Sequence, residues 1–323
     1  MAIIEAKNLN KDFKIFKRPK GAYHAVKSLF VRNYEIKEAV KDVNFSISEG
    51  EMVGYIGPNG AGKSTTIKML SGILVPSKGE AVVNGIIPYQ NRKENAMNIG
   101  VVFGQRSQLN WDLPMEDTFQ LYKRMYHIDD ALYQKNVDMF VELMDMSSFL
   151  RKPARQLSLG QKMRAEIAIA MLHSPKILYL DEPTIGLDVL VKDHIRTFIK
   201  ELNRERKTTV ILTTHDMKDI DTICNRIIMI DHGVILEDTS LSAFKDRHND
   251  SYIIKVEYES QLSEPTAPGL RCISEGKNFK VYQVQKELIT INEILSLLSE
   301  NFTIKNIDIR QEEIEEIVKK IIA

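Results

Sequence analysis

The stretch Gly57-Pro-Asn-Gly-Ala-Gly-Lys-Ser64 decides the fold of this chain. It matches the pattern G-x-x-x-x-G-K-[ST], and it stands between the apolar run Met52–Ile56 and the helical pattern Lys63–Leu70. Glycines let backbone N–H groups curl around phosphate oxygens, and the N-terminus of the following helix adds a favourable dipole. The residues expected to hold phosphates are Gly57, Pro58, Asn59, Gly60, Ala61, Gly62, Lys63, Ser64 and Thr65.

Short apolar runs separated by helical patterns recur on both sides of this loop. Such runs are typical of a parallel sheet that helices cover on both faces, which places the chain in the α/β class. Two amphipathic helices, Met115–His127 and Ala131–Met146, interrupt the alternation as a helical insertion. Ahead of the loop, Ile3–Leu9 and Val40–Ser48 read as two further strands. The buried strands are expected at Met52–Ile56, Ile99–Phe103, Ile177–Asp181, Val210–Thr213 and Arg226–Ile230.

A second motif, Ile177-Leu-Tyr-Leu-Asp181-Glu182-Pro183-Thr184, ends one of these runs in two carboxylates. Its four apolar residues fit a buried strand that delivers Asp181 to the carboxyl end of the sheet, where ligands of open α/β folds bind. Asp181 suits a carboxylate that holds Mg²⁺, and the Ser64 hydroxyl would supply a second oxygen. Glu182 would lie beside the γ-phosphate, where it can accept a proton from attacking water. Together with the phosphate loop, the motif predicts phosphoryl-transfer chemistry.

Four further motifs make the chain resemble the ABC ATPases over about residues 1–240. The pentapeptide Leu157-Ser-Leu-Gly-Gln161 is similar to the signature motif of that family and stands shortly before the second carboxylate motif. Gln105 resembles the Q-loop glutamine, and Ile185-Gly-Leu-Asp188 resembles the D-loop. His215, in Thr213-Thr-His-Asp216, resembles the H-loop histidine.

The resemblance implies a P-loop NTPase of the ABC type, with a mostly parallel sheet, an antiparallel β subdomain and a helical subdomain. It also implies that two such units dimerise head to tail around two ATP molecules. Gln105 would touch Mg²⁺ or the attacking water, and His215 would contact the γ-phosphate as a catalytic residue beside Glu182. Ser158, Gly160 and Gln161 would meet the nucleotide held by the opposite unit, and Asp188 would join the nucleotide-binding residues.

Two positions depart from the family pattern or leave it open. Leu159 stands where many members have glycine; because that position need not contact phosphate through its side chain, activity is expected to survive. The aromatic ring that usually stacks on adenine falls at Phe13 or at Phe16. Phe13 is the nucleotide-binding candidate, and ordinary strand packing is the alternative for either ring.

Composition excludes several other classes of protein. Of 323 residues 43% are hydrophobic, and 44 Lys+Arg balance 44 Asp+Glu, which excludes a disordered polyelectrolyte and argues against nucleic acid as a partner. The longest apolar runs fall short of the ~18 residues that a membrane-spanning helix needs, so a soluble, intracellular chain is expected. Cys224 and Cys272 form neither a disulfide framework nor a metal-ligand spacing.

Changes of pattern and charge predict two domains. Residues 1–245 are expected to form the ATP-binding domain, with the helical subdomain at about 106–160 and a basic hairpin insertion at about 14–38. Residues 11–41 carry nine Lys and Arg against three Asp and Glu, which is typical of a solvated face and also of a surface that meets phosphate or anionic lipid. Residues 246–323 predict a small α+β accessory domain, for which we expect a regulatory or dimer-stabilising role.

The resemblance implies a subunit of a membrane transporter that exports its substrate. One ATPase unit without membrane spans needs an integral membrane permease on separate chains and a second ATP-binding subunit, in a homodimer or a heterodimer. The chain would then lie at the cytoplasmic face of the cell membrane, held there by the permease. The long first hairpin and the accessory domain resemble ATPases of polysaccharide, teichoic-acid and drug exporters. An importer ATPase with a regulatory tail, or a soluble non-transport ABC ATPase, is the alternative.

Overall fold

The computed structural model describes residues 2–16, 34–104, 107–248 and 250–322. Their contacts divide the chain into two compact units that meet, in sequence, between Leu241 and Ser242, close to the predicted boundary at residue 245. Each unit has a sheet and a hydrophobic core of its own. Among the described residues, no helix is both long enough and apolar enough to cross a lipid bilayer.

A six-stranded sheet in the order β5-β6-β7-β3-β8-β9 forms the centre of the first unit. The strands from β5 to β8 are parallel, and β9 pairs antiparallel with β8. The five predicted apolar strands are confirmed, whereas the sequence pattern misses β9, because its residues alternate between exposed and half-buried positions. The bounds are β3 Met52–Ile56, β5 Ile99–Phe103, β6 Ile177–Asp181, β7 Thr209–Thr213, β8 Arg226–Asp231 and β9 Val234–Ser240.

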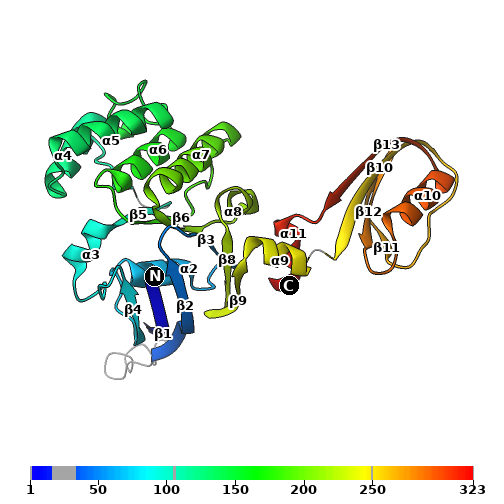
Figure 1. The fold of residues 1–323 in the computed structure, drawn as a ribbon, viewed down its shortest axis with the longest axis horizontal. Helices are drawn as coiled ribbons and strands as arrows, with labels where there is room; N and C mark the ends of the chain where they lie inside the picture. Colours follow the sequence, from blue (N-terminus) through cyan, green and yellow to red (C-terminus); the bar gives the residue numbers. More distant parts are fainter. Residues whose placement is uncertain (1, 17–33, 105–106, 249, 323) are drawn as a thin grey trace, which may run out of the picture. The chain divides into compact units, whose positions relative to one another are not determined.

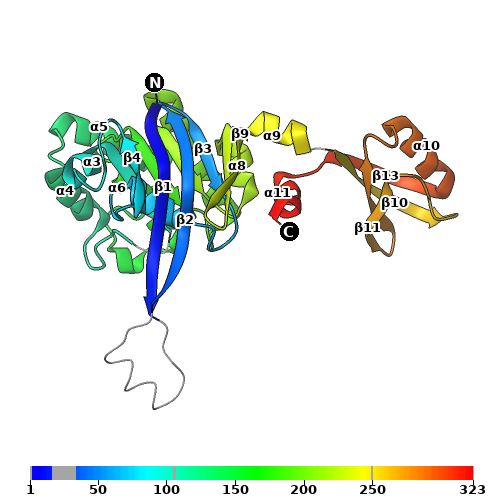
Figure 2. The same cartoon turned by 90° about the horizontal axis from the view of Figure 1, so that it is seen from below.

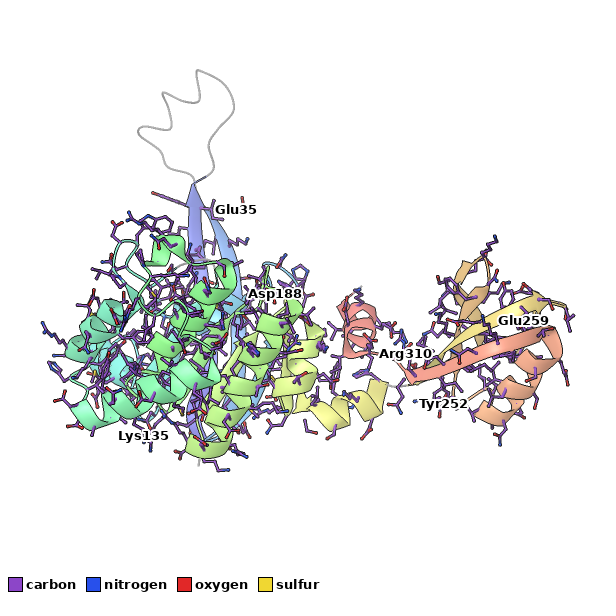
Figure 3. The ribbon with its side chains drawn as sticks, turned by 90° about the horizontal axis from the view of Figure 1, so that it is seen from above. Glu35, Lys135, Asp188, Tyr252, Glu259 and Arg310 are labelled. Atoms are coloured by element: carbon purple, nitrogen blue, oxygen red, sulfur yellow. The ribbon has the colours of Figure 1, made fainter. Side chains whose placement is uncertain are left out.

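A second, antiparallel sheet in the order β2-β1-β4 belongs to the same unit, with β1 at Ala2–Phe16, β2 at Tyr34–Ser48 and β4 at Lys78–Val83. The predicted strands were too short, because the outer half of β2 is exposed and lacks the buried alternation of its inner half. The β1–β2 ribbon extends away from the rest of the unit, and Glu35 lies near its outer end (Figures 2 and 3). Residues 17–33, with most of the predicted basic insertion, lie outside the described residues.

The core of the first unit lies between these two sheets, around α2 (Figure 1). Ile67 and Leu70 of α2 are fully buried in one cluster with Val43 and Ile47 of β2 and Tyr55 of β3. Because α2 begins directly after the phosphate loop, this packing holds the loop against the sheet. The helices are α2 Lys63–Leu70, α3 Arg92–Asn98, α4 Met115–Met125, α5 Asp130–Leu143, α6 Leu159–Met171, α7 Val189–Arg206 and α8 Met217–Ile223.

Two helices, α4 and α5, stand where the two amphipathic helices of the insertion were predicted. On α5, Leu132 is 38% exposed, while Tyr133 and Asn136 are buried. The Asn136 side chain donates a hydrogen bond to the backbone oxygen of Leu172 at 2.8 Å. A hydrophobic pattern cannot reveal such a buried polar contact, because it counts asparagine as a surface residue.

The second unit is a small α+β fold built on an antiparallel sheet in the order β11-β12-β10-β13. Helix α10 covers one face, where Ile294 and Leu298 pack with Ile254 and Tyr282 of the sheet. Tyr252 and Arg310 lie on the neighbouring strands β10 and β13 (Figure 3). The bounds are α9 Leu241–His248, β10 Ser251–Gln261, β11 Leu270–Gly276, β12 Phe279–Gln285, α10 Ile291–Asn301, β13 Phe302–Gln311 and α11 Ile314–Ile322.

Candidate active site

The loop between β3 and α2 has the backbone conformation of a phosphate cradle. Gly62 has a φ of 114°, and a Cβ atom there would lie 2.6 Å from the Ala39 carbonyl oxygen, so only glycine fits. The Lys63 side chain is 6% exposed, and its Nζ donates to the carbonyl oxygens of Gly57 at 2.7 Å and Pro58 at 3.0 Å. Burial lowers the pKa of Lys63 below its ordinary value, although Glu182 and Asp181 favour the charged form. The ammonium group is thus directed into the loop.

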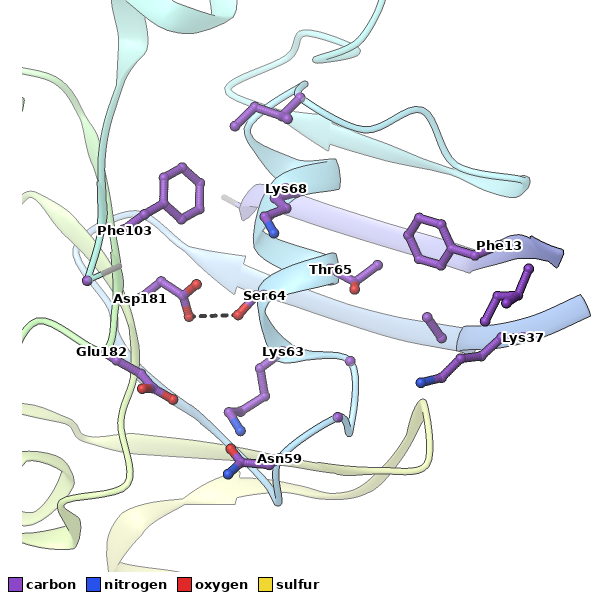
Figure 4. Close-up of a pocket in the computed structure, with 16 residues that line it drawn as sticks. Phe13, Lys37, Asn59, Lys63, Ser64, Thr65, Lys68, Phe103, Asp181 and Glu182 are labelled. Atoms are coloured by element: carbon purple, nitrogen blue, oxygen red, sulfur yellow. Dashed lines mark hydrogen bonds between the residues drawn. The ribbon is translucent and has the colours of Figure 1, made fainter. Parts of the chain in front are cut away.

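Asp181 lies at the carboxyl end of β6, beside the phosphate loop. Its Oδ1 accepts hydrogen bonds from Ser64 Oγ at 3.1 Å and from Thr213 Oγ1 at 2.5 Å (Figure 4). Asp181 and Thr213 end the neighbouring parallel strands β6 and β7, and Ser64 lies in the first turn of α2, after the loop that follows β3. A carboxylate and hydroxyl oxygens are the ligand types that hard divalent cations prefer. Ser64 and Asp181 can therefore hold a cation at this edge of the sheet.

Glu182 and His215 face each other at the same edge. His215 Nε2 lies 2.8 Å from Glu182 Oε1, and the two side chains are 43% and 20% exposed. Glu182 has a φ of 57°, which is unusual for a residue with a side chain and is typical of strained positions at functional sites. Its backbone N–H donates to the Thr213 carbonyl oxygen at 2.9 Å, which helps to hold this conformation. A carboxylate that is half-buried and oriented by an imidazole can act as a general base.

A cavity of about 550 Å³ joins the phosphate loop, the carboxylates and the β1–β2 ribbon (Figure 4). On the ribbon side, Phe13 is 37% exposed and stands next to Lys37, its partner in the strand register. Gly57, Pro58 and Ala61 complete the loop behind the cavity wall and do not line it. The lining residues are Phe13, Ile15, Lys37, Ala39, Asn59, Gly60, Gly62, Lys63, Ser64, Thr65, Lys68, Ile73, Phe103, Gly104, Asp181 and Glu182.

The pentapeptide of the signature motif forms a second cluster, with Asp188. Ser158 caps the N-terminus of α6 and shares a capping box with Gln161, while Asp188 caps α7 by accepting a hydrogen bond from the Val191 N–H at 2.9 Å. A Cβ atom on Gly160 would lie 3.0 Å from the Val191 side chain, so a small residue lets α6 approach α7. None of these four described residues, Ser158, Gly160, Gln161 and Asp188, lines the large cavity. The chain thus presents two separate sets of predicted site residues.

Three further outcomes concern individual residues. Gln105 and the side chain of Phe16 lie outside the described residues. The role of Gln105 at Mg²⁺ or the attacking water, and the stacking of Phe16 on adenine, therefore stay predictions. The sequence analysis did not predict Thr213 as a site residue. Thr213 ends the predicted strand Val210–Thr213, and in the sheet it pairs with Asp181 at the end of the neighbouring strand β6. It also missed Lys37, because its place opposite Phe13 depends on the register of a ribbon whose outer half has no apolar signal.

Comparisons with known proteins agree with this geometry. Residues 40–185 match the family model described as ABC transporter. The chain is 30% identical over 230 residues to the ABC transporter ATP-binding protein NatA of Bacillus subtilis, covering 71% of this chain and 88% of NatA. It is also 30% identical to the linearmycin resistance ATP-binding protein LnrL of the same organism, covering 79% of this chain and 81% of LnrL.

Solved structures show the same fold. A post-hydrolysis dimer of the ATP-binding cassette MJ0796 bound to ADP and Pi superposes with a TM-score of 0.63 and 28% identity, covering 74% of this chain and 98% of the cassette. The cbiO1 protein of Clostridium perfringens, part of the ABC transporter complex cbiONQ, superposes with a TM-score of 0.61 and 25% identity, covering 76% of this chain and 92% of cbiO1. The predicted α/β fold of the ABC type is confirmed.

Proposed function

The chain belongs to the family of ABC transporter ATP-binding proteins, and from this premise we propose that it hydrolyses ATP with Mg²⁺ in the large cavity to power export through a separate membrane permease. Its ATPase class follows from the family and from the likeness to a cassette bound to ADP and Pi. The observation that carries the assignment of the site is the convergence of Lys63, Asp181 and Glu182 on one cavity.

The predicted site residues divide the proposed hydrolysis among them. The backbone N–H groups of the loop and the Lys63 ammonium bind the β- and γ-phosphates, and Ser64 and Asp181 hold Mg²⁺, which neutralises phosphate charge when bound. Glu182 takes the proton from the attacking water. His215, 2.8 Å from that carboxylate, keeps it oriented and contacts the γ-phosphate. Phe13, half exposed on the cavity wall, stacks on the adenine ring.

The cluster of Ser158, Gly160, Gln161 and Asp188 supports a dimer of two ATP-binding subunits, in which each subunit completes the nucleotide site of the other. Ser158, Gly160, Gln161 and Asp188 lie away from the chain's own cavity. Leu159 and Ile185, beside them, are 52% and 49% exposed, so an apolar surface surrounds this cluster. Hydrogen-bond donors near the N-terminus of α6 suit the phosphates of a nucleotide held by a second subunit. ATP would then join the two subunits, and its hydrolysis would release them.

Three observations support a permease partner and export. Trp111, in the loop that follows the fifth strand, is 61% exposed, and exposed tryptophan residues are frequent anchors of protein interfaces. LnrL, one of the similar proteins, is named for resistance to linearmycin, which fits removal of a compound from the cell. The 15-residue strands of the β1–β2 ribbon agree with the long first hairpin that suggested the exporter class.

The partner and the direction of transport can be tested together. When the tagged full-length chain is extracted from its own membranes in mild detergent, an integral membrane protein is expected to co-purify and to raise its ATPase rate. In inside-out vesicles that carry this complex, added ATP is expected to drive the substrate into the lumen, and Glu182→Gln vesicles are the control. ATP-driven loss of substrate from the lumen would instead indicate import. A chain that purifies without any membrane protein would contradict the transporter assignment.

Residues 242–323 are proposed to regulate the ATPase or to stabilise its dimer. Their core is separate from the core that holds α2 and the phosphate loop. A chain ending at Leu241 is therefore expected to bind ATP with wild-type affinity, while subunit pairing or permease-stimulated hydrolysis changes. Fluorescent-nucleotide titration and analytical ultracentrifugation with and without ATP measure these two properties. Loss of ATP binding in a truncated chain that remains folded would show that the second unit is part of the site.

A further inference from the structure

A buried ion pair joins α7 and α8, which pack side by side (Figure 1). Arg196 of α7 is 3% exposed and Asp219 of α8 is fully buried. Arg196 Nε donates to Asp219 Oδ1 at 2.7 Å. Burial of two charges costs desolvation free energy that a pair recovers only with good geometry and further hydrogen bonds, so such a pair is weak support for a purely stabilising role.

The second oxygen of Asp219 connects the two segments that carry the catalytic candidates. Oδ2 accepts a hydrogen bond from Thr184 Oγ1 at 2.5 Å and another from Thr214 Oγ1 at 2.9 Å. Both threonines are 2% exposed. Thr184 follows Glu182 by two residues, and Thr214 directly precedes His215. One buried carboxylate therefore ties both loops to α8.

Helix α7 also contacts the segment that carries His215. Asp216, directly after His215, accepts hydrogen bonds on Oδ2 from Lys192 Nζ at 2.7 Å and from Arg196 Nη2 at 3.3 Å. The side chains of α7 thus contact Asp216 directly and Thr214 through Asp219. The same helix begins at Asp188, in the cluster proposed to face a second subunit.

We propose that Arg196 and Asp219 form a positioning pair that holds Glu182 and His215 at their 2.8 Å contact without touching the nucleotide. The proposal rests on the catalytic roles proposed above for Glu182 and His215. Its physical basis is the strained backbone of Glu182, with a φ of 57°, which persists only if the surrounding contacts over-determine it. Thr184 supplies one such contact, and its partner Asp219 is held in place by the hydrogen bond from Arg196.

Steady-state kinetics of the full-length chain distinguish positioning from mere stabilisation. Arg196→Met keeps an unbranched side chain that reaches about as far as Nε, and it removes the guanidinium charge and its donors. We expect kcat to fall at least ~10-fold, because misplacement of a catalytic group lowers the rate steeply. The dissociation constant of ATP should stay within about twofold, since the pair does not line the large cavity. In a His215→Ala background, Arg196→Met should lower kcat little further. The effects of substitutions on kcat are not additive when the substituted residues act together.

Arg226→Met is the matched control. Arg226 also belongs to an ion-pair cluster, with Asp238 and Glu51, but it begins β8 beside Val53, at the edge of the sheet opposite the phosphate loop. It is expected to lower the thermal midpoint of unfolding and to leave kcat within about twofold. If Arg196→Met does not fold, Thr184→Val tests the same connection by removing one hydroxyl, and a kcat lowered several-fold at a wild-type unfolding midpoint is expected.

Three results would overturn the proposal: an unchanged kcat in folded Arg196→Met and Thr184→Val, an equal loss of kcat in Arg226→Met, or full additivity with His215→Ala. Failure of the proposed function has a different signature. If Glu182→Gln and His215→Ala turn over ATP normally, the catalytic assignment itself is wrong. If those two variants lose turnover while Arg196→Met and Thr184→Val do not, only the positioning pair is wrong.

Discussion

Replacement of Glu182 by glutamine is expected to lower ATP turnover at least ~100-fold while ATP still binds, because general-base catalysis contributes about 10²–10⁴-fold. The amide keeps the size of the side chain and its contact with His215, but it cannot accept the proton of the attacking water. In the wild type, His215 Nε2 lies 2.8 Å from Glu182 Oε1, and the amide oxygen of glutamine can take the place of that carboxylate oxygen. Because ATP then persists, Glu182→Gln is also expected to accumulate as an ATP-bound dimer.

Two measurements check this prediction. Single-turnover hydrolysis of labelled ATP reports the chemical step, and size-exclusion chromatography with ATP and Mg²⁺ reports the dimer. Glu142→Gln, on the exposed surface of α5, makes the same chemical change away from the cavity and should behave as wild type. Normal single-turnover hydrolysis in Glu182→Gln would remove this residue from its role as the base.

Replacement of Lys63 by alanine is expected to weaken ATP binding itself. Lys63 is only 6% exposed, so little water competes for its contacts, and charge-assisted hydrogen bonds contribute roughly 1.5–3 kcal/mol each. Loss of two such contacts to phosphate corresponds to about 3 kcal/mol, or roughly a 100-fold higher dissociation constant. The variant also loses the bonds from Lys63 Nζ to the carbonyl oxygens of Gly57 and Pro58, which loosens the empty loop.

Isothermal titration calorimetry with a slowly hydrolysed ATP analogue measures the change. Lys135→Ala removes a lysine from the exposed surface of α5 and should leave the affinity unchanged. The contrast with Glu182→Gln is informative, since one variant binds without turnover and the other loses binding. Wild-type affinity in folded Lys63→Ala would show that the backbone of the loop alone holds the phosphates.

The parts of the site that could be predicted are those encoded locally. The phosphate loop needs glycine at defined positions, and its lysine and serine follow at fixed offsets. The eight consecutive residues from Gly57 to Ser64 are therefore enough to predict the loop. The carboxylates follow a buried strand, and parallel strands of one sheet end at the same edge. For this reason Asp181 could be placed near Ser64 across more than a hundred residues, and the structure gives their distance as 3.1 Å.

Other parts required the tertiary structure because they depend on register or on buried polar contacts. Lys37 reaches the cavity only because it pairs with Phe13 in a ribbon whose outer half is exposed. The Asn136 amide is buried against the end of α6, and no hydrophobic pattern marks it as a buried residue. Arg196 and Asp219 are charged residues of two helices, and no periodicity marks them as a fully desolvated pair.

The sequence alone determined the family and the order of the parallel-sheet elements along the chain, and it predicted the residues that bind the phosphates, because each of these is encoded in short contiguous motifs. The tertiary structure decided which motifs share a cavity. It brought the loop, Asp181 and Glu182 together and left Ser158, Gly160 and Gln161 on a separate surface. It also supplied the contacts that orient Glu182 and His215. The physical reason is that such contacts join residues distant in sequence, and their geometry follows from how helices and strands pack rather than from any local pattern.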